Sequence, residues 1–311
     1  MPASLTHYTF VRNNTARDTF SKARYLGGQG PDVFFFYGNA HKKRSDKKIL
    51  QGFGSKLHHM DIGPAYSFLV DYAQKSDDKE ILFAYLEGLF AHYVLDRNVH
   101  PYVFYRTGFS TDESRAKDYL LSHVAFETIL DVAYARKMET FQNPKRSIAC
   151  PKRWVDEISK MFYALSIQMN YQGLTELTYS LAYRDMRTVL GILYSPLGIK
   201  KAFLNAFKKK TVANCMSMPL SIKKYDYIDI MNNKKTTWGN VLDNSRRNES
   251  FDELVFKASN ELDYIKKLLN KAQSGENISK EICEFVHNIN HDGIPNGEQM
   301  KYFTLCWISS D

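Results

Sequence analysis

The stretch YLEGLFAHYVLDRNVHPY, residues 85–102, decides the fold class that we expect for this chain. Its apolar residues recur three and four positions apart, which is the period of an α-helix. We expect this helix to cover about residues 78–98, with Pro101 marking its end or a kink. The same period recurs along the chain and strand-like alternation is scarce, so the sequence predicts an all-α protein. A further helix is expected to follow Asn13–Thr15 and to stop at Gly27. Others are expected over 55–74, 113–139, 152–170, 174–194, 196–213, 250–273, 279–290 and 296–308, and the stretches 28–53 and 214–249 are predicted to be irregular.

Three polar residues on the first of these helices point to a metal site. His92, Asp96 and His100 follow one another at intervals of four, so on a helix they share one face. Their neighbours are apolar, and an unpaired carboxylate or imidazole would be costly to bury there. A metal ion would remove this cost by neutralising the carboxylate.

The helix expected at 113–139 repeats the arrangement. In SHVAFETIL, His123 and Glu127 are again four residues apart among apolar neighbours. One such pair more often forms a simple hydrogen bond, but two pairs on neighbouring helices can face each other across a bundle, which is how metal sites in helical bundles are built. The two pairs together favour a metal centre over isolated hydrogen bonds.

Additional ligand candidates lie upstream. His7 precedes the first expected helix, Asp32 lies in a Gly-Pro-Asp turn, and His58 and His59 lie early on the helix at 55–74. Each alone is weak, because a turn Asp is usually a cap or a solvated residue. Together they supply nitrogen and oxygen ligands of the kind that zinc takes.

Composition narrows the function classes. A chain of 311 residues with 44% hydrophobic residues can bury a sizeable core, which excludes a disordered protein. The net charge of +8 is compatible with phosphates, lipid head groups or nucleic acid, and equally with a solvated basic surface. The four cysteines form no Cys-x-x-Cys pair, so a thiolate zinc site is not indicated. A Walker A loop, a dinucleotide fingerprint and a Gly-x-Ser-x-Gly elbow are absent from the sequence.

The histidines divide the chain more clearly than the charge does. Seven of the nine lie between His7 and His123. We therefore expect residues 1–145 to form a metal-binding helical core and residues 146–311 a helical extension packed on it, as one continuous body. The N-terminal residues lack the apolar core of a signal peptide, and no apolar run reaches 18 residues, so we expect a cytoplasmic protein.

The motifs THYTF, QGPDVFFFYG, KLHHMDIG, GLFAHYVLDRNVHPY and SHVAFE carry a resemblance. In this order and at this spacing they resemble the bacterial zinc-dependent phospholipase C family, which is related to the P1/S1-type single-strand nucleases. The resemblance covers about residues 3–140, with a faint further match in ESFDELVFKA, residues 249–258. It implies a multi-helix bundle around two or three zinc ions, with additional C-terminal helices in this chain.

The resemblance also implies roles for individual residues. It assigns His58, His92 and Asp96 to one ion, His100, His123 and Glu127 to a second, and His7 with Asp96 as a bridge to a third. Asp32 would be a ligand or the base that acts on bridging water. His58 is favoured over His59 because it follows a Lys-Leu pair. The implied activity is that of a zinc-dependent phosphoric ester hydrolase, in which zinc-activated water hydrolyses a phosphodiester.

The sequence offers several candidate substrate-binding residues, each with an alternative structural role. Phe34, Phe36 and Tyr37 are candidates for an apolar wall beside the metals, with core packing as the alternative. Arg97 is a candidate for contact with a phosphate, and a structural salt bridge is the alternative. The basic stretch Lys42–Arg44 with Lys47 and Lys48 is a candidate for contact with anionic lipid or nucleic acid, against a solvated loop. His287 and His291 are interpreted as ordinary residues, because nothing else converges on them.

Two other functions stay open. An enzyme of the same metal design could act on single-stranded nucleic acid or small phosphoesters, which for a nuclease requires stacking aromatics and a basic groove. A non-catalytic helical binding protein could instead hold a structural metal, whose site would be closed by four protein ligands.

Overall fold

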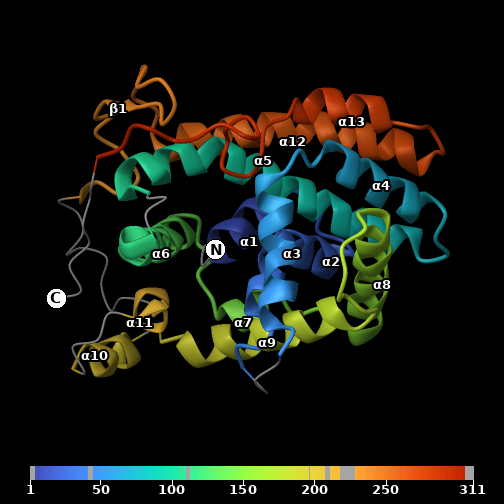
Figure 1. Cartoon of the computed structure of the whole chain (residues 1–311), viewed down its shortest axis with the longest axis horizontal. Coiled ribbons are helices and arrows are strands. Elements are labelled where there is room, and N and C mark those ends of the chain that lie inside the picture. The colour runs from blue at the N-terminus through green and yellow to red at the C-terminus, as the bar shows by residue number, and fades with distance from the viewer. Residues whose placement is uncertain are drawn as a thin grey trace.

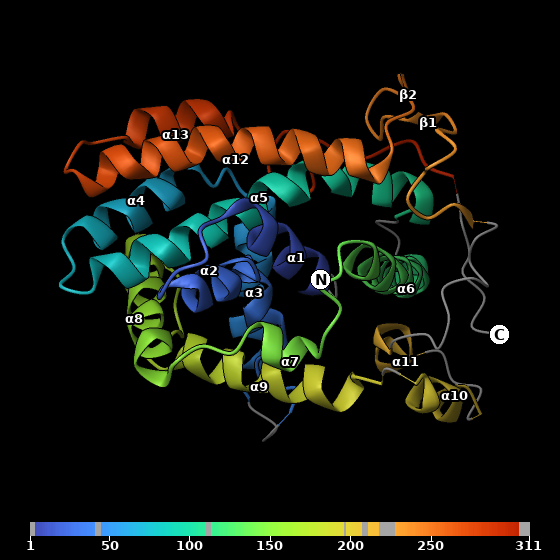
Figure 2. The same cartoon turned by 180° about the vertical axis from the view of Figure 1, so that it is seen from behind.

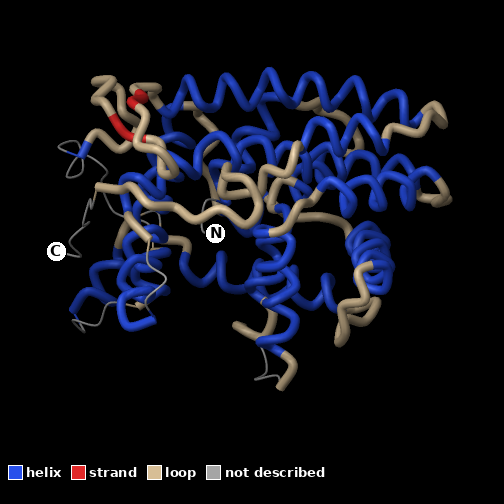
Figure 3. The backbone as a smooth tube through the Cα atoms, turned by 45° about the horizontal axis from the view of Figure 1, so that its top comes forward, coloured by secondary structure: helices blue, strands red, loops and turns tan. Residues whose placement is uncertain are grey.

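A computed structural model describes residues 4–40, 45–109, 113–195, 197–206, 211–217 and 228–304. The described chain is built almost entirely of helices (Figure 1), as predicted. The helices are α1 (Ser4–Asn14), α2 (Ser21–Gly27), the 3-10 helix η1 (Gly30–Phe36), α3 (Lys47–His59), α4 (Gly63–Gln74), α5 (Lys79–Thr107), α6 (Glu113–Lys137), α7 (Pro144–Ser147), α8 (Lys152–Gln168), α9 (Thr178–Leu193), α10 (Ile199–Ala206), α11 (Val212–Met216), α12 (Phe251–Gln273) and α13 (Ser279–Val286). Two short antiparallel strands, β1 (Trp238–Gly239) and β2 (Arg246–Arg247), form a small hairpin at one end of the molecule (Figure 3).

Helix α5 is the centre of the fold. It is buried on nearly all sides, which is the property of a helix that crosses the core and does not lie on the surface. Helices α2 and α12 both pack against it, and α12 lies beside it in both Figure 1 and Figure 2. This central position explains why the helix that carries His92, Asp96 and His100 is so rich in apolar residues.

One large hydrophobic core runs through the described chain, and a smaller cluster of Leu5, Val132 and Ala135 is separate from it. The large core includes Phe10 and Phe34 from the first part of the sequence and Phe162 and Leu262 from the second part. Helix α9 packs against η1, and α13 packs against α4, so late elements cover early ones. The helices of the second part therefore contact the first part directly.

The start of the chain differs from the expectation. Residues 4–14 form helix α1, where no helix was predicted, so His7 lies within a helix. The carboxylate of Asp131 on α6 accepts the backbone N–H groups of Leu5 and Thr6 at 3.0 and 2.8 Å. These bonds satisfy two of the donors that a helix N-terminus leaves open. Helix α1 is thus completed by a residue distant in the sequence.

Other boundaries also shift. The expected irregular stretch 28–53 contains η1 and the beginning of α3, and the helix expected at 55–74 is split into α3 and α4 by an extended Met60. Helix α5 continues through Pro101 to Thr107. The helix expected at 196–213 is two short helices with residues 207–210 outside the described part, and the described residues 296–304 are not helical.

The basic stretch predicted at the surface can be placed only in part. Within the basic stretch, Lys42–Arg44 lie outside the described residues, Lys47 donates to Asn39 at 2.5 Å, and Lys48 is exposed at the start of α3. Among the described helices, none is both long and apolar enough to span a membrane.

Candidate metal centre

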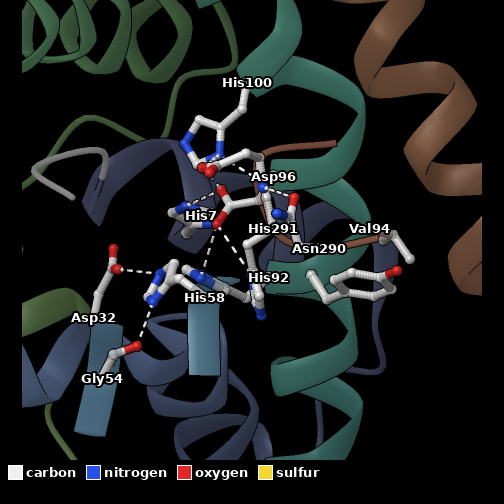
Figure 4. Close-up of polar contacts among 12 residues, drawn as sticks. His7, Asp32, Gly54, His58, His92, Val94, Asp96, His100, Asn290 and His291 are labelled. Carbon is white, nitrogen blue, oxygen red and sulfur yellow. Dashed lines mark hydrogen bonds and ion pairs between the residues drawn. The ribbon is translucent and has the colours of Figure 1, made fainter. Parts of the chain in front are cut away.

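Six segments bring a buried cluster of imidazoles and carboxylates together. Helix α1 supplies His7, η1 supplies Asp32, α3 supplies His58, and the loop after α13 supplies His291. Helix α5 supplies His92, Asp96 and His100, and α6 supplies His123 and Glu127. Figure 4 shows the part of the cluster that surrounds Asp96.

Asp96 is the hub of this cluster. The distances from its carboxylate oxygens to imidazole nitrogens are 3.2 Å to His7, 3.0 Å to His92, 3.7 Å to His100 and 3.4 Å to His291. The His7 and His92 rings stack on each other with their centroids 4.2 Å apart. A carboxylate with imidazoles on both oxygens has the arrangement that a bridging ligand needs.

Backbone carbonyls fix the orientation of three histidines. Nδ1 of His92 lies 3.1 Å from the oxygen of Gly28, and Nδ1 of His58 lies 2.8 Å from the oxygen of Gly54. Nδ1 of His100 lies 2.7 Å from the oxygen of a residue in the loop after α13. When Nδ1 donates to a carbonyl, Nε2 carries the lone pair and faces the cluster, as in most histidine metal sites.

The glycine at position 30 makes room for this arrangement. It has φ +52°, and a Cβ atom on it would lie 2.3 Å from Cδ2 of His92. Only glycine combines this backbone conformation with the space that the His92 ring occupies.

The donor atoms form three groups. In each group, atoms from different side chains lie within 4.8 Å of one another. The groups are His58, His92, Asp96 and His291; His7, Asp32 and His92; and His100, His123 and Glu127. In the third group, Nε2 of His123 lies 3.1 Å from Oε1 of Glu127, and Nε2 of His100 lies 3.4 Å from the same oxygen.

The carboxylates of Asp96 and Glu127 are held in the ionised form. Burial alone would raise the pKa of Asp96, but the adjacent imidazoles of His100 and His92 hold it well below its ordinary value. The pKa of Glu127 is also held low, against the effect of burial, by His123 and His100. Carboxylates that are ionised and buried are stable only when paired or bound to a metal.

The imidazoles also fit a metal. Nδ1 of His7, Nε2 of His92 and Nδ1 of His123 are buried and make no hydrogen bond to the described part of the chain. Buried polar atoms are rarely left without a hydrogen bond, so each of these three nitrogens is available to a ligand. Imidazole nitrogens together with carboxylate oxygens are the donor set of zinc. The residues present therefore fit a zinc centre.

The structure separates His58 from His59. The His58 side chain is 6% exposed and its Nε2 lies 2.9 Å from Oδ1 of Asp32. The His59 side chain is 57% exposed and points to Asp292, 3.5 Å away. Only His58 lies in one of the donor groups.

His291 was interpreted as an ordinary residue on which no other candidate ligand converges. This was wrong, because the structure places His291 among the candidate ligands. It is completely buried and lies within the first donor group, with its ring centroid 4.7 Å from that of His58. The spacing of His287 and His291 resembled the helical pairs, but α13 ends at Val286 and His287 has a left-handed conformation. No local signal in the sequence placed the following loop against α3 and α5.

A cavity of about 290 Å³ opens beside the cluster. Its walls include the imidazoles of His58, His100 and His123, so two donor groups face this space. The remaining lining residues are mostly apolar and aromatic: Phe35, Ser55, His59, Phe104, Gly108, Phe109, Tyr119, Leu120 and Asp292. Lys and Arg are not found among the described residues of this lining.

The residues expected to bind substrate are placed differently. Phe34 is buried in the core against Phe53 and Phe162, with ring centroids 5.1 and 5.3 Å away, and it does not line the cavity. Phe36 and Tyr37 are also buried, and neither lines the cavity. The residue of this run that does line it is Phe35, whose ring centroid lies 5.1 Å from that of His58.

Arg97 is directed away from the donor groups. Its Nε donates to Glu261 on α12 at 2.8 Å, and its guanidinium carbon lies 4.2 Å from the ring centroid of Phe285. The alternative of a structural salt bridge is therefore the one that the structure shows.

The fold and the cluster define an all-α protein whose buried imidazoles and carboxylates form a centre of zinc-binding type. The family model described as zinc dependent phospholipase C matches residues 6–172, and the chain belongs to this family. The match contains every donor residue named above except His291. Neither the curated proteins nor the solved structures yield a match to this chain.

Proposed function

We propose that this protein is a zinc-dependent phosphodiester hydrolase whose substrate is a phospholipid. The observation that most supports this proposal is that histidines from two donor groups line one cavity whose remaining walls are mostly apolar. A structural metal site is closed by protein ligands, whereas a catalytic site keeps a position that faces solvent. The placement of His58, His100 and His123 on the cavity favours the catalytic kind.

The ligand assignment follows the donor groups. His58, His92 and Asp96 hold one ion, and His100, His123 and Glu127 hold a second. His7, with Asp96 as the bridge and Asp32 nearby, offers a third position. When bound, zinc ions polarise phosphoryl oxygens, lower the pKa of bound water and stabilise the leaving oxygen.

The protein residues supply positioning and proton transfer. Asp32 is buried, and its Oδ1 lies 2.9 Å from Nε2 of His58. The adjacent imidazoles keep the pKa of Asp32 below its ordinary value, although burial acts in the opposite direction. A carboxylate that is ionised at neutral pH can ligate a metal or accept a proton from attacking water. We assign both capacities to Asp32, whose Oδ1 lies 2.9 Å from Nε2 of His58.

The walls of the cavity favour a lipid. Phe35, Phe104 and Phe109 line the cavity together with the histidines. Apolar walls with a few polar groups bind a ligand that has a hydrophobic part, with the polar groups fixing its orientation. A nuclease needs a basic groove to follow the phosphate backbone, and the described lining offers no Lys or Arg for one.

Side-by-side assays test this proposal. The zinc-loaded protein is given phosphatidylcholine in mixed micelles, a chromogenic phosphodiester and single-stranded DNA, and we expect hydrolysis to be fastest with the phospholipid. His92→Ala should lose both zinc and activity, because His92 contacts Asp96 from inside the cluster. Preference for DNA would support the nuclease alternative. Silence on all three substrates with zinc bound would support a structural metal.

A further inference from the structure

We infer that His291 is a zinc ligand, supplied by a loop that lies outside the part of the chain matched by the family. This loop, Ile289–Pro295, is called the His291 loop. The inference rests on the proposed zinc centre, and it adds a fourth protein donor to the ion held by His58, His92 and Asp96. The position open to solvent then belongs to the ion held by His100, His123 and Glu127, two of which line the cavity.

The ring of His291 lies inside the first donor group. Its Nδ1 is 3.4 Å from Oδ2 of Asp96, and its centroid is 5.2 Å from that of His92. Its Nε2 is 3.2 Å from the hydroxyl of Tyr66, which holds the far side of the ring. With Nε2 engaged by Tyr66, Nδ1 is the nitrogen directed at the ion position, and the hydroxyl acts as the outer partner that metal-bound histidines usually have.

The backbone of the same residue contacts two other ligands. The N–H of His291 donates to the carbonyl of His58 at 3.1 Å. The carbonyl of His291 lies 2.7 Å from Nδ1 of His100, which directs Nε2 of His100 toward Glu127. One residue therefore contributes a ring to the first donor group and orients a ligand of the other group that faces the cavity.

The loop is held firmly in this place. The ends of the loop pair through a bridge between Ile289 and Pro295, and Tyr93 donates to the Ile289 carbonyl at 2.8 Å. Gly293, with φ +74°, lies so close to α5 that a Cβ would be 2.2 Å from the Arg97 carbonyl and 2.7 Å from Pro101.

This contact falls where Pro101 lacks the N–H that would bond the Arg97 carbonyl in a regular helix. Gly293 of the loop therefore packs against α5 at the turn where Pro101 interrupts the helical hydrogen bonds. A histidine held from both its ring and its backbone, in a loop fixed to the metal helix, is positioned as a ligand.

The test measures zinc content and not activity. Wild type, His291→Ala and the control His287→Ala are purified, loaded with zinc, dialysed against a competing chelator and analysed for zinc by elemental analysis. His287 precedes the loop and belongs to none of the described donor groups, so it is the matched control. We expect His291→Ala to lose one equivalent of zinc or to bind it at least tenfold more weakly, with His287→Ala unchanged.

A second variant keeps the inference testable if His291→Ala does not fold. His291→Cys offers a thiolate at the same position, and thiolate is a zinc and cobalt ligand. Loaded with Co²⁺, this variant should show a thiolate-to-cobalt charge-transfer band that the wild type lacks. Wild-type zinc content and affinity in His291→Ala, or absence of the band in folded, cobalt-loaded His291→Cys, would overturn the inference. Zinc-free wild type after loading would instead contradict the proposed zinc centre as a whole.

Discussion

Nε2 of His58 lies 2.9 Å from Oδ1 of Asp32, and this contact distinguishes His58 from the adjacent His59. Both residues belong to the last turn of α3. Each has Nδ1 close to the carbonyl four residues earlier, at 2.8 Å from Gly54 for His58 and 2.7 Å from Ser55 for His59. Their rings point in different directions: His58 faces the donor groups, whereas His59 faces Asp292 at the edge of the cavity, with its side chain 57% exposed.

These neighbours give a matched pair of variants. We expect His58→Ala to lose at least one equivalent of zinc and most phosphodiesterase activity, because its Nε2 lies in the first donor group. We expect His59→Ala to retain its zinc, since its exposed side chain lies outside the groups. Elemental analysis and a phosphodiester assay on both proteins check this. Equal zinc loss in the two variants would contradict the assignment.

Gly30 gives a test that leaves every ligand in place. We expect Gly30→Ala to weaken zinc binding, because the added Cβ would lie 2.3 Å from the His92 ring. Gly275→Ala is the control, since Gly275 also has positive φ, at +98°, but nothing lies within 4 Å of an added Cβ. Both variants carry backbone strain of order 1–3 kcal/mol, so both should lower the melting temperature. Only Gly30→Ala should raise the zinc dissociation constant, measured by chelator competition, and unchanged affinity would show that His92 is not a ligand.

Two neighbouring phenylalanines of η1 have different expected roles, Phe34 in core packing and Phe35 in substrate contact. Phe34→Ala should cost about 3–5 kcal/mol of unfolding free energy, as for other buried phenylalanines, because its ring packs between Phe53 and Phe162. Phe35→Ala should leave stability nearly unchanged and raise KM for phospholipid about 2- to 10-fold, from a loss of roughly 0.5–1.5 kcal/mol of aromatic contact. Urea unfolding and steady-state kinetics distinguish the two. An unchanged KM in Phe35→Ala would mean that the cavity does not receive the lipid.

Asp131 gives a prediction on pH. Burial raises its pKa from 3.8 to about 7, although it accepts the N–H groups of Leu5 and Thr6. Because the folded state then binds the proton more tightly than the unfolded state, the stability from this group is complete below about pH 4 and is lost as the pH rises to about 7.

The variant Asp131→Asn removes this titration. We therefore expect the unfolding free energy of the wild type, minus that of the variant, to fall between pH 5 and 7 and to level off near pH 8. Urea unfolding of both zinc-saturated proteins across this range measures the difference, and effects common to both cancel. A difference that rises with pH would show that the two backbone hydrogen bonds outweigh burial and keep the carboxylate ionised.

The local spacing of residues predicted the centre of the fold well. His92, Asp96 and His100 do lie on one helix, and His123 and Glu127 lie on the next, because a four-residue interval fixes a shared face wherever a helix forms. The all-α class followed from the same period. The family resemblance added a proposed grouping of the ligand residues around each ion, which the spacing of residues alone does not supply.

The remaining features depend on contacts between distant segments. Helix α1 is buried along most of its length, so it has little polar face to reveal its period, and it is capped by Asp131, 125 residues from Thr6. His291 reaches the cluster through a loop fixed at the Pro101 position of α5. In η1, three residues complete a turn, so Phe34 and Phe35 face different ways, and the sequence of four consecutive aromatics does not indicate which one lines the cavity.

We propose that the buried donor groups bind zinc, and anomalous diffraction at the zinc edge from zinc-saturated crystals tests this claim. We predict a peak among His58, His92 and Asp96 and another among His100, His123 and Glu127, each about 2.0–2.2 Å from its ligand atoms. A map with no peak in either group, from protein that retains its fold, would contradict the claim.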